Sequence, residues 1–171
     1  MNNIFSDYYL WIILSQTWEA MSKARDRELQ SRDISERRAA LLFIIQLIGH
    51  EATPVKIARW LFREPHSISE MLDRMEKQGL VKKVKDMDRK NQVRIALTVK
   101  GKKYYQNSIK PKNIPDILTV LTQEERTQLL NSLIKLRKAA IKLVGIHYEV
   151  PLPPTDVEPL NKVNTPHKKP A

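Results

Sequence analysis

The sequence predicts a mainly α fold of the α+β class, in which one two-stranded β-hairpin interrupts a series of helices. Apolar residues recur at spacings of three and four along most of the chain, as on one face of a helix. Between residues 80 and 97 the period changes to two, which is typical of a half-buried strand. The four glycines among the 171 residues stand at apparent turns or helix caps. One compact domain with appendages is therefore expected.

A long first helix is expected over residues 4 to about 30. Its apolar residues form two adjacent stripes, with Ile4, Tyr8, Trp11 and Trp18 on one and Phe5, Tyr9 and Ile12 on the other. A surface helix needs only one apolar face, so two stripes predict burial against two neighbours. One neighbour would be the core of this chain, and the other a second subunit.

Two shorter helices should follow. Asp33 and Glu36 have the spacing of a capping box, which predicts a second helix from near Asp33 to Ile48. Thr53 as the cap and Pro54 in the first turn predict a third helix. That third helix would bury Ile57, Ala58 and Leu61.

The segment EPHSISEMLDRMEKQGL predicts a fourth helix about four turns long, which is the size of an element that enters a major groove. Pro65 suits its first turn, and Gly79 can adopt the left-handed conformation that ends a helix. Its apolar stripe consists of Ile68, Met71, Leu72 and Met75. Its other face carries polar and charged residues, namely His66, Ser67, Ser69, Glu70, Asp73, Arg74 and Lys77.

A strongly basic hairpin comes directly after the fourth helix. Its strands are expected at residues 80–85 and 92–97, with residues 86–91 as the connecting tip. Residues 77–103 contain ten Lys or Arg and two Asp, a net charge of +8 in a chain whose total is +11. A charge run alone is usually a solvated surface, but its position after a polar-faced helix favours an electrostatic contact with a phosphate backbone. The second and third helices are joined by a short turn, which is the arrangement of a helix-turn-helix. With this hairpin they predict a winged helix-turn-helix.

Two further helices are expected beyond the hairpin. Thr98 can cap the segment VKGKKYYQNS, and residues 111–115 should then break regular structure. A long final helix would begin at Thr122, with Glu125 completing a capping box, and would end at Gly145. The two long terminal helices are interpreted as dimerisation arms, with completion of a monomeric core as the alternative. The last 21 residues hold six of the ten prolines and are expected to be an extended or disordered tail.

Composition argues against several classes of protein. The chain has no cysteine, which excludes disulfides, thiolate metal sites and cysteine nucleophiles. Its four histidines lack metal-ligand spacing, and there is no glycine-rich phosphate loop, so neither an enzyme, a metal site nor a cofactor is expected. The longest apolar run has seven residues against the roughly 20 that cross a bilayer, and no basic residue precedes it as in a signal peptide. A cytoplasmic, soluble protein without membrane association is expected.

The string GLVKKVKDMDRKNQVRIALTVKG resembles the wing region of the MarR family of winged-helix transcription regulators. SISEMLDRMEKQGL is similar to the recognition helix of that family, and LTQEERTQLLNSLIKL to the start of its closing helix. The resemblance covers most of residues 33–144. The matching wing positions are Gly79, Leu80, Val81, Asp88, Arg89, Leu97, Thr98 and Gly101.

The resemblance implies a homodimer that binds double-stranded DNA at a pseudo-palindromic operator and acts as a repressor. Half-sites would lie about one helical turn apart, roughly 34 to 36 Å. The implied division is a dimerisation helix at 1–32, a winged domain at 33–108, a second dimerisation region at 109–149 and the tail at 150–171. The alternative is a non-specific architectural protein that binds nucleic acid by charge alone.

Candidate DNA contacts fall on the fourth helix and on the hairpin. The resemblance implies that Ser67, Ser69 and Arg74 contact bases and phosphates of the DNA. The two ring nitrogens of His66 suit a contact with a base. Arg89 is expected in a minor groove, although Lys90 stands where a second arginine is common. Glu70 would repel phosphates unless it accepts from a cytosine amino group or pairs with Arg74 one turn later, and the pair with Arg74 is the preferred interpretation. The other candidates are Lys77 on the helix and Lys82, Lys83, Lys85, Asp88 and Arg94 on the hairpin.

The family often carries a site for small aromatic or phenolic acids between the arms and the winged domains. A corresponding pocket could be lined by Tyr8, Tyr9, Trp11 and Trp18, with Arg38 or His50 to meet a carboxylate. Aromatic side chains at helical spacing are more often core or interface, and that alternative stays open. An effector would have to bind the DNA-incompetent form of the dimer more tightly to shift the equilibrium.

Overall fold

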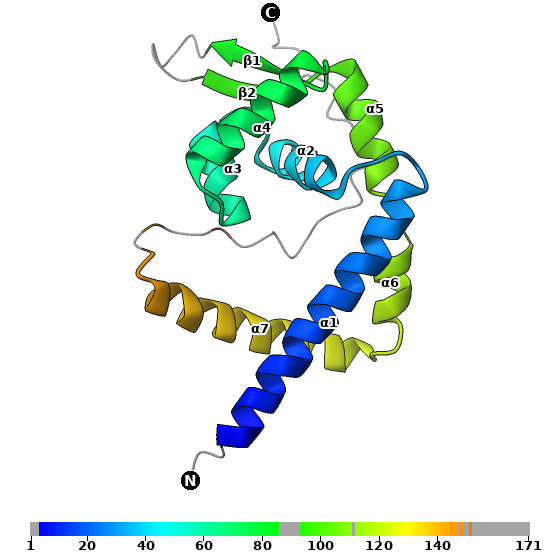
Figure 1. The fold of residues 1–171 in the computed structure, drawn as a ribbon, viewed down its shortest axis with the longest axis vertical. Coiled ribbons are helices and arrows are strands. Elements are labelled where there is room, and N and C mark those ends of the chain that lie inside the picture. The colour runs from blue at the N-terminus through cyan, green and yellow to red at the C-terminus, as the bar shows by residue number, and fades with distance from the viewer. Residues whose placement is uncertain (1–3, 86–92, 111, 147, 149–150, 152–171) are drawn as a thin grey trace, which may run out of the picture.

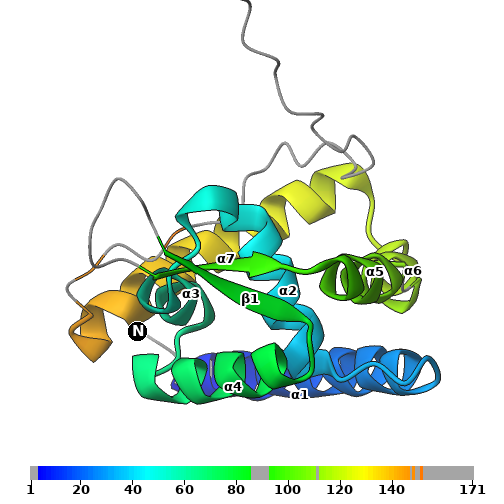
Figure 2. The ribbon, with the colours of Figure 1, turned by 90° about the horizontal axis from the view of Figure 1, so that it is seen from above.

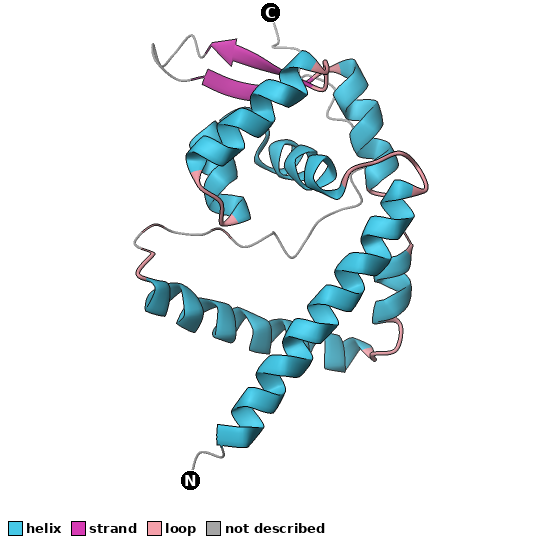
Figure 3. Ribbon diagram, viewed as in Figure 1, coloured by secondary structure: helices cyan, strands magenta, loops and turns pink. Residues whose placement is uncertain are grey.

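A computed structural model of the chain describes residues 4–85, 93–110, 112–146, 148 and 151. The expected mainly α fold with one antiparallel hairpin is confirmed (Figures 1 and 3). In chain order the elements are α1 (Ile4–Gln30), α2 (Glu36–Ile48), the 3-10 helix η1 (Gly49–Glu51), α3 (Pro54–Leu61), α4 (Pro65–Lys77), β1 (Val81–Lys85), β2 (Val93–Leu97), α5 (Val99–Ser108), α6 (Asn113–Leu118) and α7 (Gln123–Val144).

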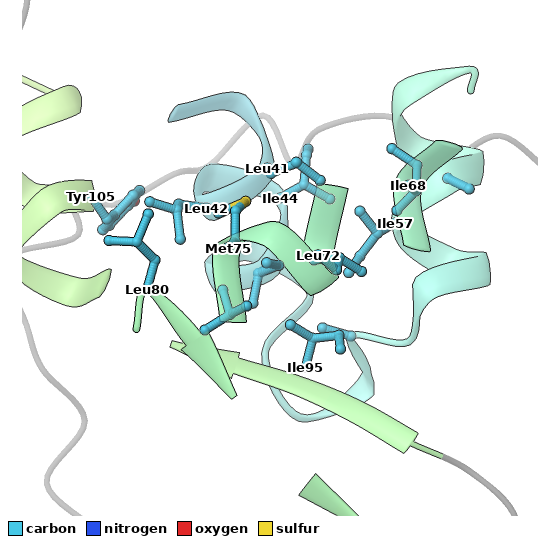
Figure 4. Close-up of a cluster of buried hydrophobic side chains, with 14 residues drawn as sticks. Leu41, Leu42, Ile44, Ile57, Ile68, Leu72, Met75, Leu80, Ile95 and Tyr105 are labelled. Atoms are coloured by element: carbon cyan, nitrogen blue, oxygen red, sulfur yellow. The ribbon is translucent and has the colours of Figure 1, made fainter. Parts of the chain in front are cut away.

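Helices α2 to α5 and the hairpin enclose the main core. Figure 4 shows side chains from α4 and α2 meeting in this core, with Ile95 of β2 facing them from the sheet. The apolar stripe expected on α4 is confirmed, because Ile68, Leu72 and Met75 are each at most 2% exposed. Burial of one such side chain contributes about 1.5–3 kcal/mol. The core therefore fixes which face of α4 points outward.

Three helix caps agree with the sequence. Thr53, at the start of α3, accepts a hydrogen bond from the Lys56 backbone N–H. Thr98 caps α5 in the same way. At the start of α7, Thr122 and Glu125 form a complete capping box. Such caps stabilise a helix by about 1 kcal/mol each, so helix starts at these positions are encoded locally.

Two local expectations were wrong. The Asp33 capping box does not form: Asp33 has a left-handed φ of 57°, and α2 begins after Ser35. The Ser35 backbone N–H donates instead to the hydroxyl of Tyr104 on α5, at 2.8 Å. The segment at 111–115 was expected to be irregular, but helix α6 begins at Asn113 within it. Asp33 instead belongs to the turn that ends α1, in which the Ile34 N–H donates to the Leu29 carbonyl oxygen at 2.9 Å, whereas α6 begins beside Glu28, which is distant in sequence.

The turn between α3 and α4 contains an unusual residue. Phe62 follows α3 in the left-handed conformation, with φ 51° and ψ 43°. Glycine is the usual residue there, because a side chain in this region costs about 1 kcal/mol or more. Phe62 remains 45% exposed to solvent.

The hairpin is fixed to α5 through a close approach at Gly101. Strands β1 and β2 pair with Val81 opposite Leu97 and Lys85 opposite Val93, as the alternation predicted. The chain then enters α5, and a Cβ atom at Gly101 would lie 1.9 Å from the backbone oxygen of Leu80. Glycine is required at this position because any side chain would collide with the start of β1.

Gly101→Ala is therefore expected to destabilise the winged domain by about 3 kcal/mol, since a backbone clash in a packed region cannot relax by rotamer changes alone. Urea unfolding followed by circular dichroism measures the effect. Lys103→Ala is the matched control, because Lys103 lies two residues further along α5 and is exposed. Equal midpoints for the two variants would contradict the close approach.

Helix α6 is held against α1 by a carboxylate. Figure 1 shows the two helices side by side. The Glu28 carboxylate accepts hydrogen bonds from the backbone N–H of Lys112 at 2.8 Å and of Asn113 at 3.1 Å. These bonds, the Lys112 bond first, lower the pKa of Glu28, with Arg32 adding a smaller effect in the same direction. Glu28 thus serves as the cap that α6 lacks in its own sequence.

This cap predicts a loss of stability in acid. Because the folded pKa of Glu28 is lowered, its contribution is complete above the ordinary value of 4.5 and disappears as the pH falls through the lower folded value. Glu28→Gln should therefore be less stable near pH 7 and should lose less stability than the parent on acidification. Urea midpoints measured from about pH 7 to about pH 3 test this. Glu124→Gln on α7 is the control, and identical pH profiles for Glu28→Gln and the parent would refute the cap.

The two long terminal helices leave much apolar surface uncovered. Trp11 is 66% exposed and Trp18 is 70% exposed on α1. Every residue of α7 is described and none of them is buried. Helices α1 and α7 cross in Figure 1, but the view from above in Figure 2 separates them in depth. Among the described side chains, α1 contributes only Leu29 to a buried cluster, and α7 contributes none.

Candidate functional site

The outer face of α4 is polar and exposed. Because its apolar stripe is buried, the opposite side projects away from the core. His66, Ser67, Glu70, Arg74 and Lys77 are all exposed there, as expected for groups that meet an external partner. Ser69 is only partly exposed, and its hydroxyl donates to the Pro65 carbonyl oxygen at 2.9 Å. The Ser69 hydroxyl is thus already engaged within the helix.

Glu70 is shared between residues one turn before it and one turn after it. The expected pair with Arg74 is confirmed, with an Arg74 nitrogen 3.9 Å from one carboxylate oxygen. The other oxygen lies 3.1 Å from Nε2 of His66. A ligand that binds the side chain of His66 or Arg74 must compete with the Glu70 carboxylate for that side chain. This carboxylate orients the two side chains and also weakens the attraction of the face for phosphate.

Lys83 does not project freely as a phosphate contact. Its ammonium lies 2.6 Å from Oδ1 of Asp73 and 3.6 Å from Oε2 of Glu76, both on α4. Its backbone N–H also donates to Oε1 of Glu76 at 2.9 Å. We call these three residues the helix–wing tie. The tie connects β1 to α4 on the exposed side of the domain.

The charges of the tie support each other. The hydrogen bond from Lys83 lowers the pKa of Asp73, and the positive charge of Lys83 lowers it further. The same hydrogen bond raises the pKa of Lys83. Both groups are therefore charged around neutral pH. Because they are exposed, they act mainly by holding two elements in register.

The remaining wing residues divide into two groups. Arg94 on β2 donates from a guanidinium nitrogen to the His50 carbonyl oxygen at 3.2 Å, which fastens the sheet to η1. Lys77, Lys82 and Lys85 are exposed, and their side chains form no hydrogen bond or ion pair within the described part of the chain. The expected wing contacts Asp88, Arg89 and Lys90 lie outside the described residues.

The residues expected to line an effector pocket do not meet within one chain. Tyr8, Trp11 and Trp18 are exposed along α1, and Tyr9 is exposed at 67%. His50 is exposed on η1, where its carbonyl oxygen accepts a hydrogen bond from Arg94 of β2. Arg38 lines a separate open depression of about 530 Å³ at the α1–α2 turn, together with Asp26, Gln30, Asp33, Ile34, Ser35, Glu36 and Arg37.

No group of three or more His, Cys, Asp or Glu side chains in the described ranges has the arrangement of a metal site. No helix in the same residues combines the length and hydropathy of a membrane span.

Sequence reasoning missed Asp73 and Glu76 as partners of Lys83. Their side chains meet only because Gly79, with φ 71°, turns the chain back along α4. The signal was the pair of acidic residues at a spacing of three on the flank of a helix that was otherwise assigned to DNA. The sequence alone does not fix the turn geometry that brings Lys83 to that flank.

Comparison with known families places the site in a DNA-binding domain. Residues 34–101 match the family described as a winged helix DNA-binding domain. This range contains the whole outer face of α4, the helix–wing tie and the hairpin. A comparison with curated proteins found no significant match.

Solved structures support the same fold over a larger part of the chain. The organohalide-sensing transcriptional regulator RdhR, solved with 2,4-dichlorophenol bound, is 33% identical, with a TM-score of 0.70. The match covers 86% of this chain and 90% of that one. MarR of E. coli, solved with operator DNA, is 20% identical, with a TM-score of 0.68 and coverage of 79% and 99%. MepR of S. aureus, solved with DNA, is 24% identical, with a TM-score of 0.63 and coverage of 77% and 97%.

Proposed function

Because the chain belongs to the MarR family of winged-helix DNA-binding transcription regulators, we propose that it binds a specific operator as a homodimer and represses transcription there. The family and the solved relatives are DNA-binding regulators rather than enzymes. A dimer bound across a promoter would exclude other proteins from that promoter. We therefore propose that the protein represses transcription rather than activating it. The proposed division of the chain is that of the sequence: arms at 1–32 and 109–149, the winged domain at 33–108 and the tail at 150–171.

The observation that carries the dimer is the apolar surface of both terminal helices. Tyr8, Trp11 and Trp18 on α1 are each at least 66% exposed, and α7 presents exposed leucines at helical spacing. Monomeric proteins rarely expose contiguous apolar patches of this kind. A second copy would cover both helices, and its two-fold axis would match a pseudo-palindromic operator.

Within each half-site, we assign different roles to the residues of the exposed face. His66 and Ser67 in the first turns of α4 would meet base edges, and Arg74 would bind a phosphate. Lys77, Lys82 and Lys85 supply attraction that carries no sequence information. From the sequence, Arg89 keeps its proposed place in a minor groove. Lys83 and Arg94 would act on DNA only indirectly, because their side chains are engaged within the domain.

A selection experiment tests the proposal. A duplex enriched by the protein from a random pool should bind at least roughly 10³-fold more tightly than an unselected duplex at the same salt concentration. Equal affinity for both duplexes would contradict operator binding and favour the non-specific architectural alternative. Sedimentation of the free protein should show two chains per particle.

We also propose a small phenolic effector. Support comes from RdhR, which was solved with 2,4-dichlorophenol. In this chain Tyr8, Trp11 and Trp18 could border a pocket only together with a second copy, because they are exposed in one chain. The same DNA titration in the presence of 2,4-dichlorophenol tests this part. An unchanged affinity would remove this compound as an effector and leave DNA binding intact.

A further inference from the structure

The chain returns to the winged domain after α7. Tyr148 and Pro151 follow the end of that helix, and the Tyr148 ring lies 5.0 Å from the guanidinium carbon of Arg59 on α3. Pro151 also borders a depression of about 390 Å³ beside Trp60 of α3 and Ile48 of α2. Tyr148 and Pro151 thus lie against the helix that precedes the DNA-binding helix.

Arg137 on α7 contacts the same region of the winged domain. Its guanidinium carbon lies 5.1 Å from the centroid of the Phe62 ring, which directly follows α3. One guanidinium nitrogen of Arg137 also donates to the Pro151 carbonyl oxygen at 3.0 Å. One side chain therefore contacts both the winged domain and Pro151. Planar guanidinium groups are well suited to such combined stacking and hydrogen bonding.

The conformation of Phe62 fits a role in this contact. Its left-handed backbone is one that glycine adopts without cost and that a bulky residue resists. At this position a phenylalanine is worse for the turn than glycine. Its ring is instead available to α7, where the Arg137 guanidinium stacks on it.

The contact has a direct path to the DNA-binding face. Only Phe62, Arg63 and Glu64 separate α3 from α4, and the two helices pack against each other. Restraining the end of α3 against α7 therefore restrains α4 against the arm. Without the contact, the described part of the chain would join the winged domain to the arms only where α1 leads into α2 and where α5 leads into α6.

We propose that Phe62, Arg137, Arg59, Tyr148 and Pro151 form a clamp that fixes the position of the recognition helix α4 relative to the dimerisation arm. Arg137 is a positioning residue in this clamp and does not contact DNA. The clamp rests on the proposed dimer for its effect on operators, because in a dimer it sets the separation of the two α4 helices. If the clamp is loose, the two α4 helices of the dimer adopt many separations. The affinity of the dimer for an operator with fixed half-site spacing is then lower.

The test compares three variants. Arg137→Gln removes the shared cation, and Phe62→Gly removes the ring while relieving the left-handed backbone. Lys138→Gln is the matched control, because it removes the same charge from the next position on α7. Since the chain has no cysteine, a single Gln78→Cys at the end of α4 allows a spin label on each copy. The distance distribution between the two labels reports the separation of the recognition helices.

Arg137→Gln and Phe62→Gly should each broaden that distribution and weaken binding to the selected duplex by roughly ten-fold, which corresponds to 1.4 kcal/mol. Binding to a duplex with a single half-site should stay at the parent value. Phe62→Gly should keep an unfolding midpoint at or above that of the parent, which a merely structural role of the ring would not allow. Lys138→Gln should match the parent in all measurements.

Parent-like distributions and affinities in both Arg137→Gln and Phe62→Gly would overturn the clamp. An equal loss in Lys138→Gln would also overturn it, because charge alone would then explain the effect. Sedimentation tests the dimer separately. If the parent sediments as one chain, the proposed dimer fails, and hydrogen exchange of residues 141–146 then decides the clamp. Faster exchange in Phe62→Gly supports the clamp, and unchanged exchange refutes it.

Discussion

Leu133→Glu is expected to convert the protein from a dimer to a monomer and to weaken operator binding by at least about 100-fold. Leu133 lies on the exposed apolar stripe of α7, together with Leu129, Leu130 and Leu136. In a two-fold dimer the substitution is present twice, so two carboxylates would lose water at one interface. Operator binding falls further because two linked half-site contacts become independent.

The change should spare the fold of the single chain, because Leu133 is 37% exposed there and α7 contains no buried residue. Asn131→Glu is the control, since it adds the same charge to the opposite face of α7. Light scattering coupled to size exclusion gives the oligomeric state, and circular dichroism reports helicity. A dimeric Leu133→Glu variant with parent affinity would show that α7 does not form the proposed interface.

Most elements of the fold follow from short-range patterns. Helices α1, α3, α4 and α7 begin and end close to their expected positions, because apolar period and caps such as Thr53 and Thr122 act within a few residues. The hairpin follows from the switch to a period of two. These features depend on neighbouring residues, so the sequence contains the information directly.

The misses share a different physical cause. Helix α2 begins after Ser35, whose N–H meets Tyr104 across 69 positions of the chain. Helix α6 forms next to Glu28, which caps it from more than 80 positions away. In the candidate site, Lys83 was assigned to phosphate because its partners on α4 become visible only when the turn is known. In each case the partner is met only in the folded chain, whether it lies 69 or 84 positions away, as for Ser35 and Lys112, or 10 and 7 positions away, as for Lys83.

Asp73→Asn is expected to weaken binding to the selected operator by roughly ten-fold, although it removes a negative charge from a surface that meets DNA. Electrostatics alone predicts the opposite sign, since less negative charge means less repulsion of phosphate. The positioning argument predicts the loss. Without the Asp73 carboxylate, Lys83 keeps only the more distant carboxylate oxygen of Glu76, and the wing loses its register with α4.

The matched control is Glu64→Gln, which removes the same charge just before α4. Glu64 is exposed, and its side chain makes no capping hydrogen bond to the helix. Glu64→Gln should therefore bind both the selected and the unselected duplex slightly more tightly than the parent. Asp73→Asn should lose affinity for the selected duplex and keep affinity for the unselected one, because only the former requires both elements to be placed correctly. Titrations at one fixed salt concentration give all four values. If both variants gain affinity, the acidic residues of α4 act only by repulsion, and Lys83 returns to the role of a phosphate contact.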